Sequence, residues 1–127
     1  MDELSAGTGL KSMKLDAIHG YHAHVYFEPE TRGEAERLRA RMEAEFPDGL
    51  YGRWHDRPVG PHPSAMFQVA FDKPLFATLV PWLALNHGSL TVFLHPETGD
   101  DLADHAEHAI WIGRQQTLKL EQFMRAP

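Results

Sequence analysis

Histidine is the residue type that offers this sequence the most chemistry. The chain has 127 residues, and nine of them are histidines that are spread along the sequence instead of forming a terminal tract. His22 and His24 stand one residue apart in YHAHVYF (residues 21–27). This segment has the pattern of a strand, in which alternate side chains share a face, so both imidazoles point the same way. Imidazole is a common ligand of divalent iron, zinc and copper, and the pair therefore indicates a metal site on a sheet.

The composition excludes several other kinds of site and partner. The chain has no cysteine, so a disulfide, a thiolate metal site and a cysteine nucleophile are all excluded. Its formal net charge is -6, and it has no basic stripe with interleaved aromatic residues, which argues against nucleic acid as a partner. The apolar windows are shorter than the roughly 20 residues needed to cross a bilayer, and the first residues do not have the pattern of a secretory signal. We therefore expect no membrane contact and a cytoplasmic location.

The length of the chain suits one domain. We expect residues 1–17 to form a flexible N-terminal arm and residues 18–127 to form a single domain.

The order of the predicted elements favours a ferredoxin-like fold. Strands are expected at residues 21–27, 50–56, 65–71 and 89–95, and helices at about 32–46 and 73–87. This βαββαβ order is typical of an α+β fold in which an antiparallel sheet carries both helices on one face. Residues from Asp100 to about Met124 have a mostly helical pattern, so we expect a C-terminal helical extension.

Strand periodicity assigns residues to the face of the sheet that the helices leave uncovered. In the ferredoxin-like order the first and fourth strands are antiparallel neighbours, so His22 should lie close to His95, with His24 one pleat further along. The three imidazoles form the predicted metal cluster. The same face should also carry His55 and the following residues: Tyr26, Met66, Gln68, Thr91 and Phe93.

The other histidines are open to more than one interpretation. His62 lies between two prolines in GPHP, at the end of the sheet opposite His22 unless its loop folds back over the face. His105 and His108 share a predicted helix face, and we expect His105 to be a site candidate and His108 to be at the surface. A lone strand histidine is more often a surface or core residue than a ligand, so the cluster depends on the convergence of two strands.

Four separated segments of the chain resemble the DOPA 4,5-dioxygenase family. They are YHAHVYF (21–27), VGPHPSAMFQV (59–69), NHGSLTVFLHPETGDDLADH (86–105) and the Trp-Ile-Gly at 111–113. The resemblance implies a ferredoxin-like homodimer that cleaves a catechol ring in extradiol fashion with non-haem iron and O2. The recurrent histidines of the family fall on the following positions: His22, His24, His62, His95 and His105.

This resemblance and the predicted geometry together give a hypothesis for the site. His22, His24 and His95 would bind Fe(II), although zinc or another divalent metal is also compatible with the donors. A carboxylate ligand is left open among Glu28, Glu97 and Asp101. His62 or His105 would transfer protons.

The substrate would be a catechol such as DOPA, and we expect five residues to bind it. Tyr26, Met66 and Phe93 would form an apolar wall against the ring, and Arg53 or Arg57 would bind a substrate carboxylate.

Two other functions are compatible with the same residues. One is a non-catalytic dimeric ferredoxin-like protein that binds a small aromatic ligand on its uncovered sheet face. The other is a histidine-lined enzyme that uses zinc or no metal.

Overall fold

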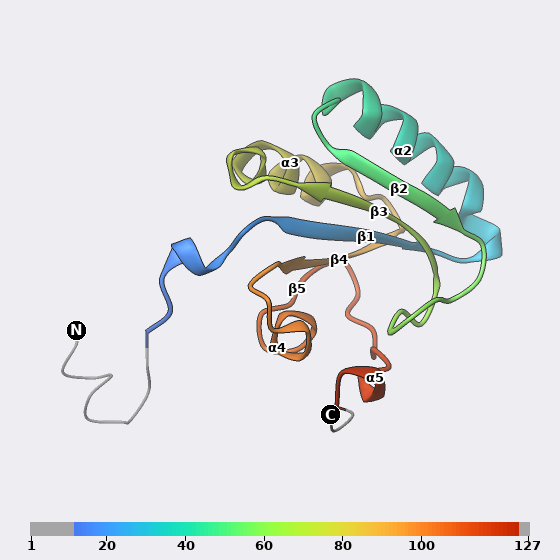
Figure 1. Ribbon diagram of the computed structural model, residues 1–127. Helices are drawn as coiled ribbons and strands as arrows, with labels where there is room; N and C mark the ends of the chain where they lie inside the picture. Colours follow the sequence, from blue (N-terminus) through green and yellow to red (C-terminus); the bar gives the residue numbers. More distant parts are fainter. Residues whose placement is uncertain (1–11, 125–127) are drawn as a thin grey trace.

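A five-stranded antiparallel sheet forms the centre of the computed structural model, which describes residues 12–124. Its strands are β1 (Tyr21–Phe27), β2 (Leu50–His55), β3 (Ala65–Phe71), β4 (Thr91–Pro96) and β5 (Ile110–Ile112). They lie in the order β2-β3-β1-β4-β5 (Figure 1). The first four strands have the predicted ferredoxin-like order, and the α+β fold class is confirmed.

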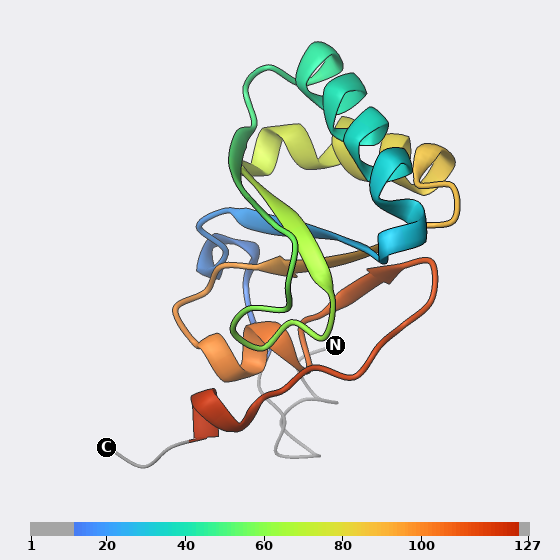
Figure 2. The same ribbon diagram turned by 90° about the vertical axis from the view of Figure 1, so that its right-hand side faces the viewer.

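Two helices cover one face of the sheet. They are α2 (Arg32–Glu45) and α3 (Lys73–Asn86), which lie side by side on the same side of the strands (Figures 1 and 2). α2 buries Ala35, Leu38 and Met42, and α3 buries Leu79 and Leu83. The predicted strand periodicity is confirmed, because the alternate residues of β1, β3 and β4 expected on this face belong to the main apolar core or, in the case of Tyr21, pack against it.

The second face of the sheet is covered by the chain itself. The loop between β2 and β3 and the segment after β4 pack on this face, which α2 and α3 leave free (Figure 1). A smaller apolar cluster forms there from Tyr26, Met66 and Phe93, and Val59, Ala109, Trp111 and Leu118 pack against it. β4 is therefore covered on both faces of the sheet, and all six of its residues are buried.

The C-terminal part is less helical than its sequence pattern predicts. It contains α4 (Asp101–His105) and α5 (Glu121–Met124), two short helices separated by β5 and by residues without regular structure. The expectation of helix through most of this part was wrong, because Ile110 and Ile112 pair with Leu94 and Val92 of β4. Without β5, the edge of β4 would have unpaired backbone groups, and the added strand satisfies them.

The region before β1 is described only in part. Residues 1–11 of the expected N-terminal arm lie outside the described residues. The described residues before β1 include a short 3-10 helical turn, η1 (Leu15–Ala17). A second such turn, η2 (Pro29–Thr31), follows β1. Across residues 12–124, none of the helices combines the length and the apolar character that a bilayer crossing requires.

Candidate metal centre and active site

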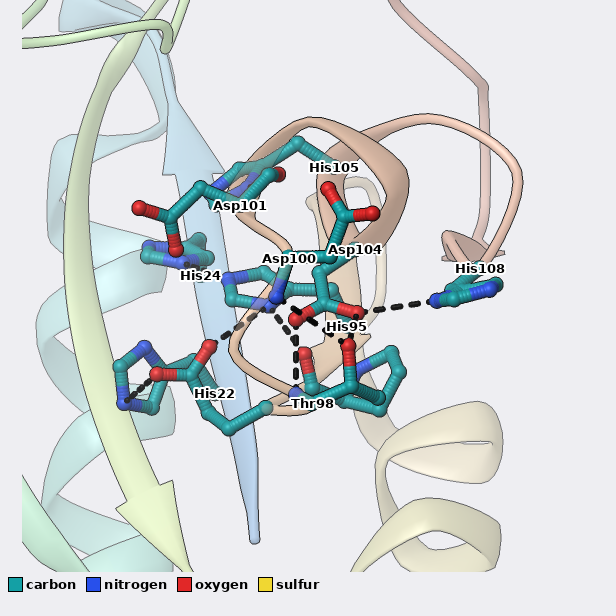
Figure 3. Close-up of polar contacts among 11 residues, drawn as sticks. His22, His24, His95, Thr98, Asp100, Asp101, Asp104, His105 and His108 are labelled. Atoms are coloured by element: carbon teal, nitrogen blue, oxygen red, sulfur yellow. Dashed lines mark hydrogen bonds and ion pairs between the residues drawn. The ribbon is translucent and has the colours of Figure 1, made fainter. Parts of the chain in front are cut away.

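Three histidines from two adjacent strands converge on the second face of the sheet. His22 is directly opposite His95 in the pairing of β1 with β4, as the strand order predicted. His24 Nε2 lies 3.2 Å from His95 Nε2. Each of the three residues offers one ligand atom, and these atoms all lie within 4.8 Å of one another. The three are hereafter called the histidine triad (Figure 3).

The nitrogen atoms of the triad fit a metal ion. Two imidazole ligands with metal–nitrogen bonds of about 2.1 Å at tetrahedral or octahedral angles have their nitrogens about 3.0–3.4 Å apart, which matches the separation of His24 and His95. His95 Nδ1 lies 2.9 Å from the carbonyl oxygen of Pro96, so Nδ1 donates its hydrogen and Nε2 retains its lone pair. A backbone carbonyl that holds the second nitrogen of a metal ligand is a common feature of such sites.

Burial keeps two members of the triad, His24 and His95, in the neutral form that binds metals. His24 is 2% exposed and His95 is 1% exposed. Burial lowers the pKa of His24 well below its usual value, and the neighbouring His62 lowers it further. Burial also lowers the pKa of His95 to about 4, although its hydrogen bond to Pro96 acts in the opposite direction. Both imidazoles are therefore neutral at neutral pH, with no proton to lose before a metal binds.

His24 also has a buried nitrogen without a partner. Its Nδ1 atom has no hydrogen-bond partner among residues 12–124. An unpaired buried polar atom typically costs about 1–3 kcal/mol, so His24 is poorly suited to a purely structural role.

Glu97 is the carboxylate that contacts the triad. Its Oε1 atom lies 3.5 Å from His22 Nε2, and its Oε2 atom lies 3.4 Å from His95 Nδ1. Burial raises the pKa of Glu97, and the nearby Asp104 and Asp101 raise it further. Of the other two predicted carboxylates, Glu28 accepts a hydrogen bond from Ser64 and Asp101 is exposed. Glu97 is thus placed to orient the rings of two triad members.

The β2–β3 loop folds back over the sheet and brings His62 to the triad. The His62 ring centroid is 4.1 Å from that of His24, and His62 is 5% exposed. Its Nδ1 atom lies 2.8 Å from the Tyr26 hydroxyl. Burial, with a smaller effect of His105, lowers the pKa of His62 to about 4.

α4 brings His105 to the other side of the triad. Its ring centroid lies 4.1 Å from that of His95 and 6.5 Å from that of His62. Its Nδ1 atom is 2.7 Å from the carbonyl oxygen of Asp101. All five histidines predicted for the site therefore lie together.

A buried aspartate next to His105 fixes the turn between β4 and α4. Asp104 is fully buried and accepts hydrogen bonds from Thr98 N at 2.8 Å and from the Thr98 hydroxyl at 2.7 Å. His108 Nδ1 lies 2.9 Å from the same carboxylate (Figure 3). This network is not among the features predicted from the sequence, although the four-residue spacing of Asp104 and His108 is a signal for it. His108, which was expected at the surface, is half-buried because it forms this bond.

Substitution of Asp104 by asparagine should lower stability and change its dependence on pH. Burial alone would raise the pKa of Asp104, but the hydrogen bonds from Thr98 and His108 outweigh it and lower the pKa. The stabilisation is therefore complete above the unfolded pKa of about 4 and is lost as the pH falls through the lower folded pKa. Because asparagine replaces one acceptor oxygen with an amide, we expect a loss of about 1–3 kcal/mol in the free energy of unfolding at pH 7.

Urea denaturation at pH 7 and at pH 3 measures this effect. The difference between wild type and Asp104→Asn should shrink at the lower pH. Asp100→Asn is the matched control, because Asp100 caps α4 through Ala103 N and asparagine caps a helix equally well. Equal unfolding free energies for wild type and Asp104→Asn at pH 7 would contradict the prediction.

The residues predicted to bind the substrate do not form one surface. Tyr26, Met66 and Phe93 are buried under the C-terminal part of the chain, with exposures of 2%, 4% and 0%. Arg53 is exposed and lines a hollow with residues of α2, and Arg57 is exposed in the β2–β3 loop. Among the residues that the structure describes, neither arginine forms a hydrogen bond or ion pair with the triad.

Open space adjoins the triad at the end of the sheet where β1 begins. A hollow of about 390 Å³ is lined by His22 and Glu97, by Tyr21 of the same strand β1, and by Ala70 and Phe71 of β3. This hollow reaches a member of the triad directly, and its volume is sufficient for a single aromatic ring.

Comparison with known proteins identifies the family of this chain. The model of the Dopa 4,5-dioxygenase family matches residues 21–122. The chain belongs to this family. The match includes every residue of the triad as well as His62 and His105, so the resemblance seen in the sequence is confirmed.

Individual members of the Dopa 4,5-dioxygenase family support the same conclusion. An uncharacterized 21.2 kDa protein of Botryotinia fuckeliana is 33% identical, over 96% of this chain and 78% of its own length. A DOPA 4,5-dioxygenase of Amanita muscaria is 29% identical over 89% of this chain, which spans only 53% of that enzyme. The crystal structure of a protein of Nostoc punctiforme, described as a candidate dioxygenase, has 44% identity and a TM-score of 0.85, with 89% of this chain and 96% of that one covered. These relatives support an oxygenase function.

Proposed function

We propose that the protein is a non-haem iron-dependent extradiol dioxygenase that cleaves the ring of a catechol such as DOPA. The observation that carries the proposal is the convergence of His22, His24 and His95, which place one ligand nitrogen each within 4.8 Å of one another. Two of the three, His24 and His95, are buried, and their nitrogens lie 3.2 Å apart. Membership of the Dopa 4,5-dioxygenase family supports the same reaction class.

Each part of the proposed reaction has residues that suit it. His22, His24 and His95 would hold the iron(II), which would supply open coordination positions for a catecholate and O2. Cleavage breaks a ring carbon–carbon bond beside a hydroxyl-bearing carbon, and both oxygen atoms of O2 enter the product. The ring is oxidised and O2 is reduced, so no external reductant is required. His62 and His105, which lie against the triad, are placed to move the catechol protons.

The hollow beside His22 is the proposed place of the substrate ring. It is open, it adjoins the triad, and its lining includes the aromatic residues Tyr21 and Phe71. Tyr26, Met66 and Phe93 have a different role in this proposal. These three side chains form an apolar cluster next to the histidine triad, on the side away from the hollow, and exclude water from the triad.

Iron loading followed by a catechol assay tests the proposed function. Protein purified without oxygen and supplied with Fe(II) should bind about one iron per chain, consume O2 and catechol in equal amounts, and form a yellow ring-cleaved product. Chelator treatment should abolish the colour. Full iron loading with no O2 consumption would contradict the proposal. If the protein bound catechol without cleaving it, and chelator did not weaken this binding, the result would instead support a non-catalytic protein that binds an aromatic ligand.

A further inference from the structure

His62 and His105, the two histidines that lie against the triad, have different hydrogen-bond partners: a hydroxyl for His62 and a backbone carbonyl for His105. We infer that these partners fix opposite tautomers, so that His105 accepts a proton from the substrate while His62 donates a hydrogen bond to it. The assignment of these roles rests on the proposed function, whereas the tautomers follow from contacts alone.

The partner of His105 fixes its tautomer directly. His105 Nδ1 lies 2.7 Å from the carbonyl oxygen of Asp101, one turn earlier in α4. A carbonyl oxygen only accepts hydrogen bonds, so Nδ1 must carry the hydrogen. A neutral imidazole has one N–H, and therefore His105 Nε2 presents a lone pair.

The partner of His62 gives the opposite result. His62 Nδ1 lies 2.8 Å from the Tyr26 hydroxyl, and both side chains are buried. Burial raises the pKa of Tyr26, so its hydroxyl keeps its hydrogen at all ordinary pH values. When the hydroxyl donates to Nδ1, both groups are satisfied and His62 carries its hydrogen on Nε2. In the reverse arrangement, the Tyr26 O–H would have no acceptor among the described residues.

Both rings lie against the triad. His62 packs against His24 and His105 packs against His95, each with ring centroids 4.1 Å apart. The centroids of His62 and His105 are 6.5 Å apart. A catechol bound at the triad would therefore have a hydrogen-bond donor and an acceptor close to it.

The two tautomers divide the proton chemistry of the proposed reaction. A catechol hydroxyl loses its proton to His105 Nε2, which breaks the O–H bond, forms an N–H bond and leaves the negative charge on oxygen. The resulting imidazolium still donates from Nδ1 to Asp101. His62 Nε2–H donates a hydrogen bond to an oxygen that gains negative charge. Tyr26 is then a positioning residue for His62, and it does not touch the substrate as first predicted.

Nitrogen NMR of the metal-free, full-length protein with labelled histidine tests the tautomers. We expect hydrogen on Nε2 of His62 and on Nδ1 of His105. Tyr26→Phe should shift the Nδ1 resonance of His62, because that atom loses its hydrogen-bond donor, and should leave the resonances of His105 unchanged. Tyr51→Phe is the matched control, because the Tyr51 hydroxyl also donates one hydrogen bond, to the Phe46 carbonyl, far from the histidines. Hydrogen on His62 Nδ1 in the wild type would overturn the inference.

A substrate that is already ionised tests the division of roles in the iron-loaded enzyme. With catechol, His105→Gln and His62→Gln should each lower kcat by about 100-fold or more. With 4-nitrocatechol, which has lost its first proton near neutral pH, the loss caused by His105→Gln should shrink at least tenfold relative to wild type. The loss caused by His62→Gln should remain.

The outcomes separate the inference from the proposed function. Equal losses with both substrates for His105→Gln would overturn the role of His105 as proton acceptor. If iron-loaded wild type cleaved neither catechol, the proposed function would fail, while the NMR result would still decide the tautomers.

Discussion

Replacement of His95 by alanine is expected to remove metal binding and ring cleavage together. His95 is the member of the triad whose free nitrogen is best defined, because the Pro96 carbonyl holds its Nδ1 and directs Nε2 toward His24. Loss of a residue that orients a ligand typically costs 10–100-fold in metal affinity or activity. Loss of a ligand should exceed this range, so we expect kcat/KM to fall by more than about 100-fold.

Iron content and the catechol assay together measure this effect. His87→Ala is the control, because His87 also bonds a backbone carbonyl, that of Leu90, but is not part of the triad. The control should keep both iron and activity. A His95→Ala protein that retained about one iron per chain and full activity would show that the triad is not the metal site.

The triad could be predicted from the sequence because two simple periodicities determine it. Alternation along 21–27 places His22 and His24 on one face, and the ferredoxin-like order makes the fourth strand an antiparallel neighbour. The observed pairing of His22 with His95 is the direct result of these two rules. The triad depends on strand geometry, which varies little between proteins.

The placement of His62 could not be predicted in the same way. Local sequence shows a rigid Pro-His-Pro loop but does not determine which way the loop turns. Its position depends on contacts with residues distant in sequence: the Tyr26 hydroxyl holds His62, and Val59 packs on the cluster of Tyr26, Met66 and Phe93. Such long-range contacts leave no periodic signal in the loop itself.

β5 was missed for a related reason. Its three residues are too few to show alternation clearly, and the surrounding leucines and alanines favour a helix. The strand forms because the edge of β4 offers unpaired backbone groups to it. The same tertiary packing buries Phe93, which sequence reasoning had assigned to the substrate.

Phe93→Ala should therefore destabilise the fold, which is a different result from weakened substrate binding. The Phe93 ring is fully buried, and it lies 4.8 Å from the Trp111 ring and 5.3 Å from the His95 ring between centroids. Truncation of a fully buried phenylalanine typically lowers the free energy of unfolding by about 3–5 kcal/mol. The cavity would also let the His24 and His95 rings move, so we expect weaker iron binding in the folded protein.

Urea denaturation with the Phe123→Ala control separates packing from substrate contact. Phe123 also packs against a site histidine, with its ring centroid 4.6 Å from that of His105, but it is only partly buried in α5. Truncation of Phe123 should lower the free energy of unfolding far less, because water can fill the space that its partly exposed ring leaves. If Phe93→Ala kept wild-type stability and raised only the KM for catechol, the ring would be part of the substrate wall. Because the ring is enclosed by the chain, we expect the loss of stability to come first and the loss of activity to follow from it.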